Sequence, residues 1–262
     1  MYPPRAVSSD EQGRARPVAV ILAAGKGTRM RSPLPKVLHP LAGAPLVLYP
    51  LRAAWAAGVG RVVIVVGHGG AQVREQVLAT ARGSIAFATQ AEQRGTGDAV
   101  RCALPSLTAA DDPVLILSGD VPLINAATLT ALRDACERAS GELSLATFRP
   151  DDPTGYGRLL RDVDGHVIGV REQRDASAAE RAIGECNAGV YCARARLLVE
   201  ALPRLGAANA QGEIYLTDLV AVAARRGAVI TVEVPALEVA GVNTPEQLAE
   251  LERAYLEARA AS

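Results

Sequence analysis

A loop that follows the first apolar run combines glycines with a series of basic side chains. The run reads "VAVILAA" and the loop reads "GKGTRMRSPLPK". Glycines let successive backbone N–H groups turn toward one anion, and long basic side chains spread positive charge over its remaining oxygens. The basic residues of the loop are Lys26, Arg29, Arg31 and Lys36. This combination predicts a polyphosphate site at the end of the first strand.

The same region lacks acidic residues, since no Asp or Glu occurs between Glu11 and Glu75. The whole chain of 262 residues has 28 Lys+Arg and 28 Asp+Glu, so its formal net charge is zero. Positive charge is therefore concentrated locally, and no global field favours binding of nucleic acid or of an anionic membrane. Taken alone, the loop could also be a solvated basic surface. This alternative applies to Lys26 in particular.

Two common phosphate-binding loops do not fit this stretch. The P-loop pattern G-x-x-x-x-G-K-[ST] is absent, which excludes that class of nucleotide site. A dinucleotide fingerprint needs three glycines and an acidic residue about 20 positions later. Gly25 and Gly27 fill the first two positions, but Met30 occupies the third and the acid is missing. A dehydrogenase is therefore excluded.

A second candidate is Asp120, which follows the apolar stretch "PVLILSG". Such a run predicts a buried strand, and an aspartate directly after it emerges at the carboxyl edge of the sheet. Ligands of parallel sheets gather at this edge. We therefore expect Asp120 to lie next to the basic loop and to be functional.

The elements that would position these residues alternate between apolar runs and helix-period segments. The runs are "VAVILAA", "RVVIVVG", "SIAFAT" and "PVLILSGD". The helical segments are Pro45 to Ala57, Ala71 to Ala81, Gly97 to Leu107 and Ala126 to Ala139. This order predicts a parallel sheet with right-handed crossovers and helices on both faces.

The pattern changes after Pro150. The stretch "GYGRLLRDVDGHVIGVREQRD" indicates two antiparallel strands joined at Asp164 and Gly165, a hairpin signal. We further expect a strand at "GECNAGVYCA", a helix from about Glu213 to Arg226, a strand at "AVITVEV" and a helix from Pro245 to about Arg259. The predicted class is α/β, with a Rossmann-like, mainly parallel sheet and a small antiparallel flap.

The chain is expected to form one domain, 17–262, after a disordered tail, 1–16. Within it we distinguish a nucleotide-binding half, 17–140, a sugar-binding half, 141–243, and a C-terminal helix, 244–262. No run approaches the roughly 20 apolar residues of a membrane span, and the first residues lack the apolar stretch of a signal peptide. The cysteines lie far apart without a C-x-x-C pair, and we expect them to be reduced and structural. They are Cys102, Cys136, Cys186 and Cys192.

The ordered motifs of the chain resemble those of the sugar nucleotidyltransferases. After "LAAGKGTRM" and "LPKVL" come "QAEQRGTGDAV", "SGDVPL", "DDPTGYGR", "REQRDA", "NAGVY", "QGEIYLTD" and "GVNTPEQL". In this order and spacing they are similar to the uridylyltransferase domain of the bifunctional N-acetylglucosamine-1-phosphate uridylyltransferase and glucosamine-1-phosphate acetyltransferase.

The resemblance implies a Mg²⁺-assisted reaction in which UTP and N-acetylglucosamine 1-phosphate give UDP-N-acetylglucosamine and pyrophosphate, for cell-wall synthesis in the cytoplasm. The family's second half, a β-helix of hexapeptide repeats, has no counterpart in the sequence, so acetyl transfer is not expected. The chain is either a piece of a longer protein or a stand-alone homologue. Because that β-helix organises the family's trimer, we expect a monomer or a weak oligomer, with no nucleic-acid or membrane partner.

The resemblance also assigns roles to individual residues. Arg29 and Lys36 would orient and neutralise the reacting phosphates. The nucleotide would be bound by Leu22, Ala23, Ala24, Gly25, Gln90, Gly95 and Thr96. The sugar would be bound by Gly157, Glu172, Asn187, Tyr215 and Thr217. Mg²⁺ would be bound by Asp120 and Asn243.

Two of these residues, Gln90 and Asn243, have alternative roles, and Ser118 departs from the family pattern. A glutamine amide offers a donor and an acceptor that complement O4 and N3–H of uracil, which suits Gln90, although it could also satisfy a strand edge. Asn243 could instead cap the last helix, but Thr244 could take that role and leave Asn243 free. Ser118 departs from the family, several members of which carry an aromatic residue before the Gly-Asp pair.

Other functions remain to be distinguished. A pyrophosphorylase acting on another sugar or base would share these motifs. A glycosyltransferase of related fold would normally show D-x-D, whereas Val121 and Pro122 follow Asp120. A non-catalytic binding protein is disfavoured because the candidate arginine, lysine, aspartate and asparagine are all present.

Overall fold

The computed structural model describes residues 17–81, 83–107, 113–138 and 141–260. The segment 1–16, predicted to be a disordered tail, lies outside the described residues. No helix within the described ranges is long and apolar enough to cross a membrane.

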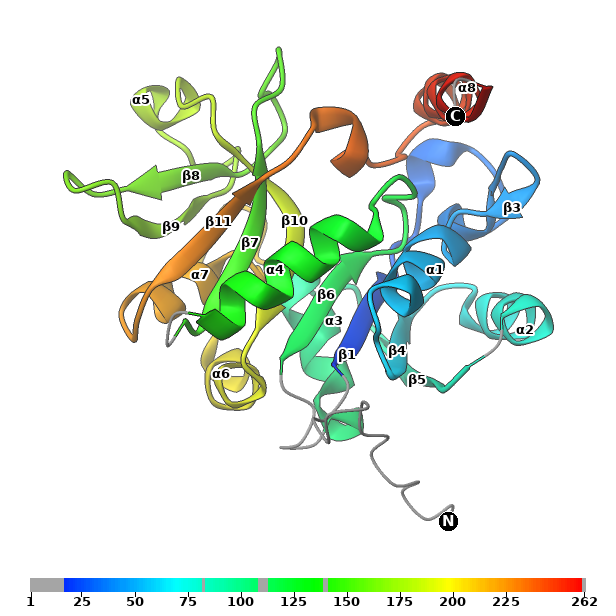
Figure 1. The fold of residues 1–262 in the computed structure, drawn as a ribbon, viewed down its shortest axis with the longest axis horizontal. Coiled ribbons are helices and arrows are strands. Elements are labelled where there is room, and N and C mark those ends of the chain that lie inside the picture. Colours follow the sequence, from blue (N-terminus) through cyan, green and yellow to red (C-terminus); the bar gives the residue numbers. More distant parts are fainter. Residues whose placement is uncertain (1–16, 82, 108–112, 139–140, 261–262) are drawn as a thin grey trace.

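One sheet runs through the whole described part of the chain (Figure 1). Its main path has the order β11-β7-β10-β6-β1-β4-β5. The strands are β1 (Val18–Ala23), β4 (Arg61–Val66), β5 (Ile85–Thr89), β6 (Val114–Ser118), β7 (Leu143–Phe148), β10 (Cys186–Ala193) and β11 (Val229–Glu233). β1 pairs in parallel with β4 and β6, as β4 does with β5 and β11 with β7, whereas β10 is antiparallel to β6 and β7. The predicted mainly parallel α/β sheet is confirmed.

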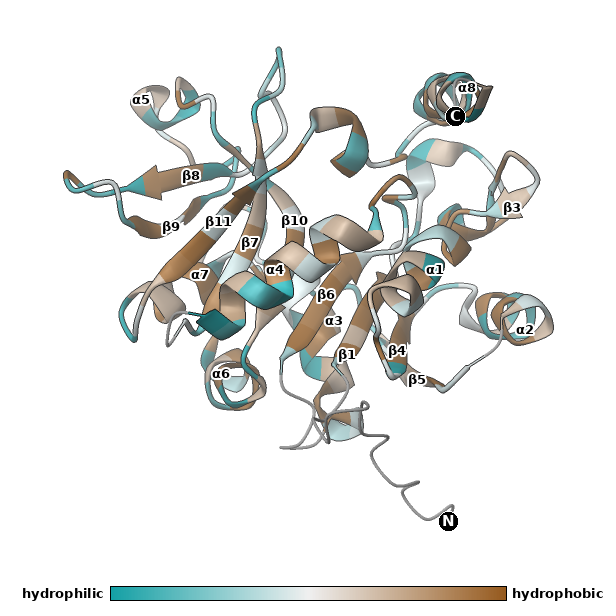
Figure 2. Ribbon diagram, viewed as in Figure 1, coloured by the Kyte–Doolittle hydropathy of each residue, from teal (hydrophilic) through white to brown (hydrophobic). Residues whose placement is uncertain are grey.

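Helices cover both faces of this sheet because its central strands are apolar on both sides. Along β1, Ala19 and Ile21 belong to one buried cluster, while Val18 and Val20 belong to the other. The first cluster includes α1 (Leu48–Ala56), α2 (Gly70–Thr80) and α4 (Ala126–Arg138). The second includes α3 (Thr96–Ala103), α6 (Ala195–Ala201) and α7 (Asp218–Ala224). The hydropathy colouring shows the apolar strands between these helices (Figure 2).

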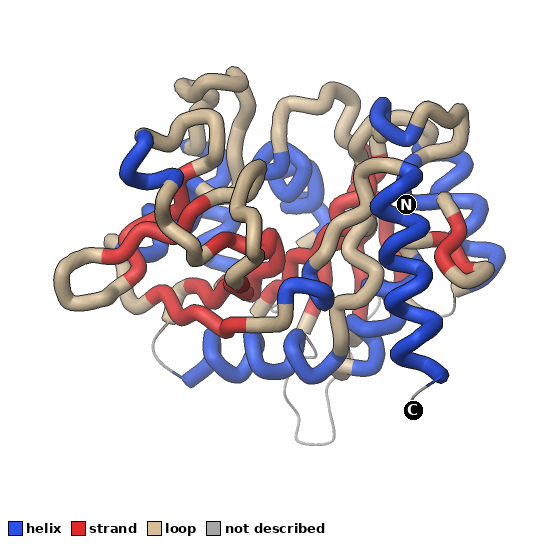
Figure 3. Tube along the Cα trace, turned by 90° about the horizontal axis from the view of Figure 1, so that it is seen from above, coloured by secondary structure: helices blue, strands red, loops and turns tan. Residues whose placement is uncertain are grey.

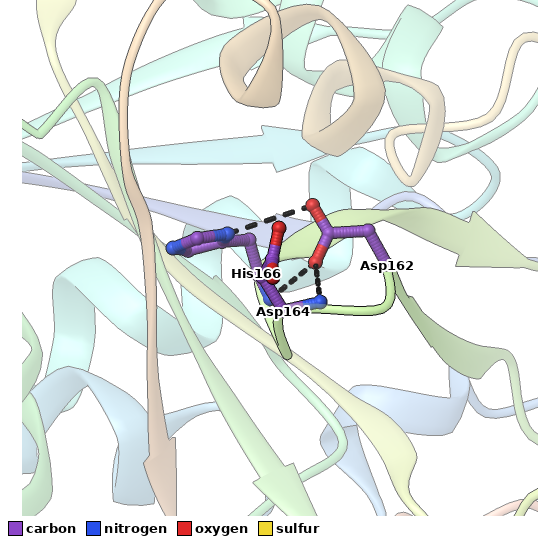
Figure 4. A group of neighbouring side chains, drawn as sticks. All are labelled: Asp162, Asp164 and His166. Atoms are coloured by element: carbon purple, nitrogen blue, oxygen red, sulfur yellow. Dashed lines mark hydrogen bonds and ion pairs between the residues drawn. The ribbon is translucent and has the colours of Figure 1, made fainter.

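The predicted hairpin after Pro150 is present as β8 (Arg158–Arg161) and β9 (Val167–Arg171). Its turn is closed by Asp162, whose carboxylate accepts hydrogen bonds from the backbone N–H groups of Asp164 and His166, at 3.0 and 2.8 Å (Figure 4). These bonds lower the pKa of Asp162. β8 also pairs with β10, so the hairpin continues the main sheet. The short helix α5 (Ala178–Arg181) follows it.

The C-terminal helix α8 (Pro245–Ala260) packs outside the two groups of helices that cover the faces of the sheet (Figure 3). Its Leu251 lies in a small cluster with Met30 and Leu41 of the first loop region. This region contains the short strands β2 (Pro40–Leu41) and β3 (Ala44–Pro45). Single 3₁₀ turns occur at Thr28–Met30, Lys36–Leu38, Leu104–Ser106, Leu202–Arg204 and Ala236–Val239. Helix α8 therefore links the far end of the chain to the basic loop.

Some elements differ from the sequence-based expectations. The helix expected from Glu213 begins only at Asp218, and the residues before it form hydrogen bonds with Arg94 and with the first two residues of α3. Strand β7 and helix α6 were not predicted. All four cysteines lie within the described residues, and none of them forms a disulfide.

The hairpin is held to the sheet by an ion pair that generates a stability prediction. Glu185 accepts hydrogen bonds of 3.0 and 2.8 Å from Arg161, and this interaction is the main cause of the lowered pKa of Glu185. A carboxyl whose folded-state pKa is depressed stabilises the fold above its unfolded pKa, and this contribution disappears as the pH falls through the folded-state pKa.

We therefore expect Glu185→Gln to lower the free energy of unfolding by about 1 kcal/mol near neutral pH. The difference from the wild type should shrink as the pH falls below about 4.5. Urea unfolding followed by circular dichroism at several pH values measures both effects, with Glu257→Gln on the exposed part of α8 as the control. A difference that grows toward acid pH would contradict this assignment.

Candidate active site at the carboxyl edge of the sheet

Asp120 lies at the meeting point of three distant segments. It follows β6, where the backbone N–H of Gly119 donates to the carbonyl of Leu22 in β1, at 2.8 Å. Its own backbone carbonyl accepts from the N–H of Val242, at 2.9 Å, which places Asn243 beside it. The sheet register and these two backbone bonds therefore bring the aspartate, the basic loop and the segment before α8 together.

The side chains of these segments form one polar network. The ammonium of Lys36 forms an ion pair with Asp120 and lies 3.3 Å from Oδ1 of Asn243. The same Oδ1 accepts a hydrogen bond of 2.9 Å from the guanidinium of Arg29. Lys36 and Asp120 are mostly buried, with side-chain exposures of 15% and 20%. Two oxygens from different segments thus converge on one cationic group.

The conformation of the basic loop depends on a glycine. Gly27 has a φ of +61°, in the left-handed region, and a Cβ there would lie 2.6 Å from the Cβ of Lys36. A larger residue would displace Lys36 from Asp120. Lys26, whose role the sequence left open, is exposed and does not line the cleft described next.

The sequence left open whether the side chain of Asn243 caps α8. In the structure, the neighbouring Thr244 makes the capping contact. The hydroxyl of Thr244 accepts a hydrogen bond from the backbone N–H of Gln247, at 3.3 Å. The side chain of Asn243 points instead to Arg29 and Lys36. The amide oxygen of Asn243 is therefore directed at the site and not at the helix terminus.

A cleft of about 250 Å³ opens beside this network. All residues expected to bind the nucleotide line it, together with Lys36 and Asp120. Those residues are Leu22, Ala23, Ala24, Gly25, Gln90, Gly95 and Thr96. Arg29 lines an adjoining hollow with Thr28, Arg31 and Glu246. Arg29 of this hollow and Lys36 of the cleft share Oδ1 of Asn243 as an acceptor.

The amide of Gln90 is arranged differently from the sequence-based expectation. Its Nε2 donates to the carbonyl of Gly95, at 3.0 Å, and to the carboxylate of Asp98, at 2.9 Å. Both hydrogens of the amide are therefore used inside the protein. Gln90 cannot offer both a donor and an acceptor to a base as expected, and only its Oε1 is left as an acceptor.

Four of the residues expected to bind the sugar lie in two small groups. In the first, the hydroxyl of Thr217 donates to Glu172, at 2.8 Å, and a Cβ on Gly157 would lie 3.5 Å from the other oxygen of Glu172. Burial raises the pKa of Glu172, while the hydrogen bond from Thr217 opposes this shift. In the second, the amide of Asn187 donates to the buried hydroxyl of Tyr191, at 2.6 Å.

The segment 213–217 contacts both the cleft and Glu172. Ile214 accepts from the N–H of Gly97, at 2.8 Å, and the N–H of Leu216 donates to the hydroxyl of Thr96, at 3.1 Å. Glu213 lines the cleft, whereas Thr217 contacts Glu172 and the hydroxyl of Tyr215 accepts from Gln211.

Sequence reasoning missed several residues of the cleft. The amide of Gln93 donates to the carbonyl of Ala24, at 3.3 Å, and so contacts the glycine-rich turn. Asp98 contacts Gln90, and Glu213 lines the cleft. Asp98 lies in the first turn of α3, where an acidic residue stabilises any helix. An aspartate at this position therefore did not indicate a contact with Gln90.

A larger groove of about 600 Å³ lies between α1 and α8. Its lining is mainly apolar and includes Tyr49, Leu123, Leu237 and Tyr255. It includes none of the residues of the Lys36 network, so we assign the site to the smaller, polar cleft.

Comparison with known proteins shows the family of the chain. The profile of the MobA-like NTP transferase domain matches residues 19–215. Similar relatives named "Bifunctional protein GlmU" come from Chromohalobacter salexigens, at 52% identity, Anaeromyxobacter sp. Fw109-5, at 51%, and Sorangium cellulosum, at 50%. These alignments cover 92, 92 and 89% of this chain and 52, 50 and 50% of the respective relatives, so the chain spans about half of their length. The expected nucleotidyltransferase is confirmed: the chain belongs to the MobA-like NTP transferase family.

Proposed function

We propose that the protein transfers the uridylyl group of UTP to N-acetylglucosamine 1-phosphate, releasing pyrophosphate and forming UDP-N-acetylglucosamine with Mg²⁺. The observation that carries this proposal is the convergence of Asp120, Asn243, Lys36 and Arg29 beside a polar cleft. The motifs of the sugar half favour the acetylated sugar. The proposed product serves cell-wall synthesis in the cytoplasm.

The donor set of the site fits Mg²⁺. A carboxylate oxygen of Asp120 and the amide oxygen of Asn243 are hard oxygen ligands, which this ion prefers. Both oxygens already contact the same ammonium, that of Lys36, so they can face a single cation. When bound there, Mg²⁺ would neutralise phosphate charge and help to hold the triphosphate.

The protein's own cations supply the remaining charge stabilisation. An oxygen of the sugar phosphate attacks the α-phosphorus of UTP, and the bond from this phosphorus to the bridging oxygen breaks, so that pyrophosphate leaves. Negative charges approach one another in this step, and the site must hold them in line. Lys36, on release from Asp120, and the exposed Arg29 are placed to bind these phosphates, with the turn at Ala24 and Gly25 beside them.

The base and the sugar would occupy opposite sides of the segment 213–217. Oε1 of Gln90 can accept the N3–H of uracil, and the backbone at Gly95 and Thr96 lines the same cleft. Across the segment, Glu172 can accept hydrogen bonds from sugar hydroxyls, and Asn187 can reach the acetamido group. These two groups are the proposed basis of substrate choice.

Of the predictions that test the proposed function, the first concerns Asp120. Asp120→Ala should reduce turnover at least about a hundredfold, because a metal ligand that contributes several kcal/mol is lost. The melting temperature should change by only a few degrees, roughly what loss of a partly exposed ion pair produces. Pyrophosphate release and thermal unfolding measure the two effects, with Asp134→Ala in α4 as the control. Joint loss of fold and activity would instead make Asp120 a structural residue.

The second prediction concerns Arg29. Arg29→Ala should lower kcat about 10²–10³-fold with a smaller effect on the KM for the sugar phosphate, because the guanidinium is proposed to meet charge that develops in the transition state. Steady-state kinetics with the sugar phosphate varied at saturating UTP separate the two parameters. Near-normal kcat would show that this part of the loop is only a solvated surface.

The third prediction tests the proposed substrates. A panel of nucleoside triphosphates and sugar 1-phosphates, scored by pyrophosphate release, should favour UTP over CTP by about tenfold to a few thousandfold, since each unpaired buried polar group costs about 1–3 kcal/mol. N-acetylglucosamine 1-phosphate should be preferred to glucosamine 1-phosphate. Comparable efficiencies for UTP and CTP would refute the base-binding role of this cleft.

A further inference from the structure

The contact between Asp98 and Gln90 is a feature that the proposed reaction does not require. Asp98 is 8% exposed and Gln90 is 3% exposed, and the two side chains are hydrogen-bonded at 2.9 Å. The second hydrogen of the Gln90 amide goes to the carbonyl of Gly95. The amide nitrogen thus faces two groups, a carboxylate and a carbonyl, that only accept hydrogen bonds.

These two acceptors determine the orientation of the Gln90 amide. A free glutamine can exchange its oxygen and nitrogen by rotation and so match either a donor or an acceptor on a ligand. Here the flipped amide would place Oε1 against Oδ2 of Asp98 and the carbonyl of Gly95, while its nitrogen would lose both partners. Buried polar groups that face only their own kind are costly. Oε1 is therefore held as the ligand-facing acceptor.

The Gly95 part of this arrangement is fixed by the backbone. Gly95 has a φ of +109°, and a Cβ there would lie 2.4 Å from the carbonyl oxygen of Ile214. The N–H of Ile214 also donates to the carbonyl of Arg94, at 2.7 Å. The carbonyl of Gly95 therefore cannot easily turn away, and Asp98 is the side chain that can be varied by substitution.

We propose that Asp98 determines base selectivity by locking the amide of Gln90 with its oxygen toward the cleft. This inference rests on the proposed use of the cleft for a pyrimidine nucleotide. Uracil presents N3–H as a donor to that oxygen, whereas cytosine presents an acceptor at N3. Asp98 acts through Gln90 and touches no substrate, so it is a positioning residue whose effect is on selectivity and not on the chemical step.

The test is Asp98→Asn, which keeps the shape of the side chain and adds a donor. The substituted amide can accept from Gln90 as the carboxylate does, or donate to a flipped Gln90, so the flipped orientation loses one of its two penalties. We expect the ratio of kcat/KM for UTP to that for CTP to fall about tenfold, mainly through a gain with CTP. Asp98→Ala, which removes the acceptor without adding a donor, should give a smaller fall. Asp134→Asn in α4 makes the same chemical change away from the cleft and should leave the ratio unchanged.

Calorimetric titration of UTP and CTP separates this inference from the proposed reaction. If the wild type binds UTP better than CTP but transfers it to no sugar phosphate, the proposed reaction fails, and the Kd ratio of the Asp98→Asn variant still tests the lock. An unchanged UTP/CTP ratio in that variant overturns the inference. The inference is also overturned if the variant unfolds normally but loses the same amount of affinity for UTP and for CTP. That result would give Asp98 a purely structural role.

Discussion

The position of Asp120 relative to the first loop is the constraint on which the site depends. The aspartate follows β6 and the loop follows β1, and these strands are parallel neighbours in which Leu22 is paired with Ser118. Parallel strands deliver their carboxyl ends to the same edge, so the carboxylate meets the basic side chains without any long excursion of the chain. The bond from Val242 to Asp120 adds the third segment and, with it, Asn243.

The charges at this edge suit a substrate that carries more negative charge than Asp120 does. Lys36 is paired with Asp120, and Arg29 is hydrogen-bonded to the neutral Asn243. Lys36 therefore has a partner of opposite charge and also contacts Asn243. Arg29, Arg31 and Lys26 of the same loop are exposed, and the chain contains no Asp or Glu between Glu11 and Glu75. Incoming phosphates therefore meet a local excess of positive charge in a chain of zero net charge.

The segment 213–217 gives the site its second half. Its backbone is hydrogen-bonded to Arg94, Thr96 and Gly97, next to the part of the cleft proposed to bind the base, while Thr217 contacts Glu172. A helix that began at Glu213 would have used the carbonyl of Ile214 for its own hydrogen bonds and left it unavailable to the N–H of Gly97. The late start of α7 is therefore what allows the nucleotide cleft and the proposed sugar group to share one wall.

The sequence by itself determined the alternating strands and helices of the first half, the hairpin, the last helix and the acid-free basic loop. These features depend on local periodicity, turn residues and charge, which can be read without knowing the fold. The parallel order of the strands also placed Asp120 at the correct edge. The tertiary structure alone decided which atoms meet there. It assigned the helix cap to Thr244, turned Asn243 toward Arg29 and Lys36, and committed both amide hydrogens of Gln90 to Gly95 and Asp98. Such choices depend on hydrogen-bond partners supplied by other segments, and a residue's type and spacing do not specify which of its donors and acceptors those partners will occupy.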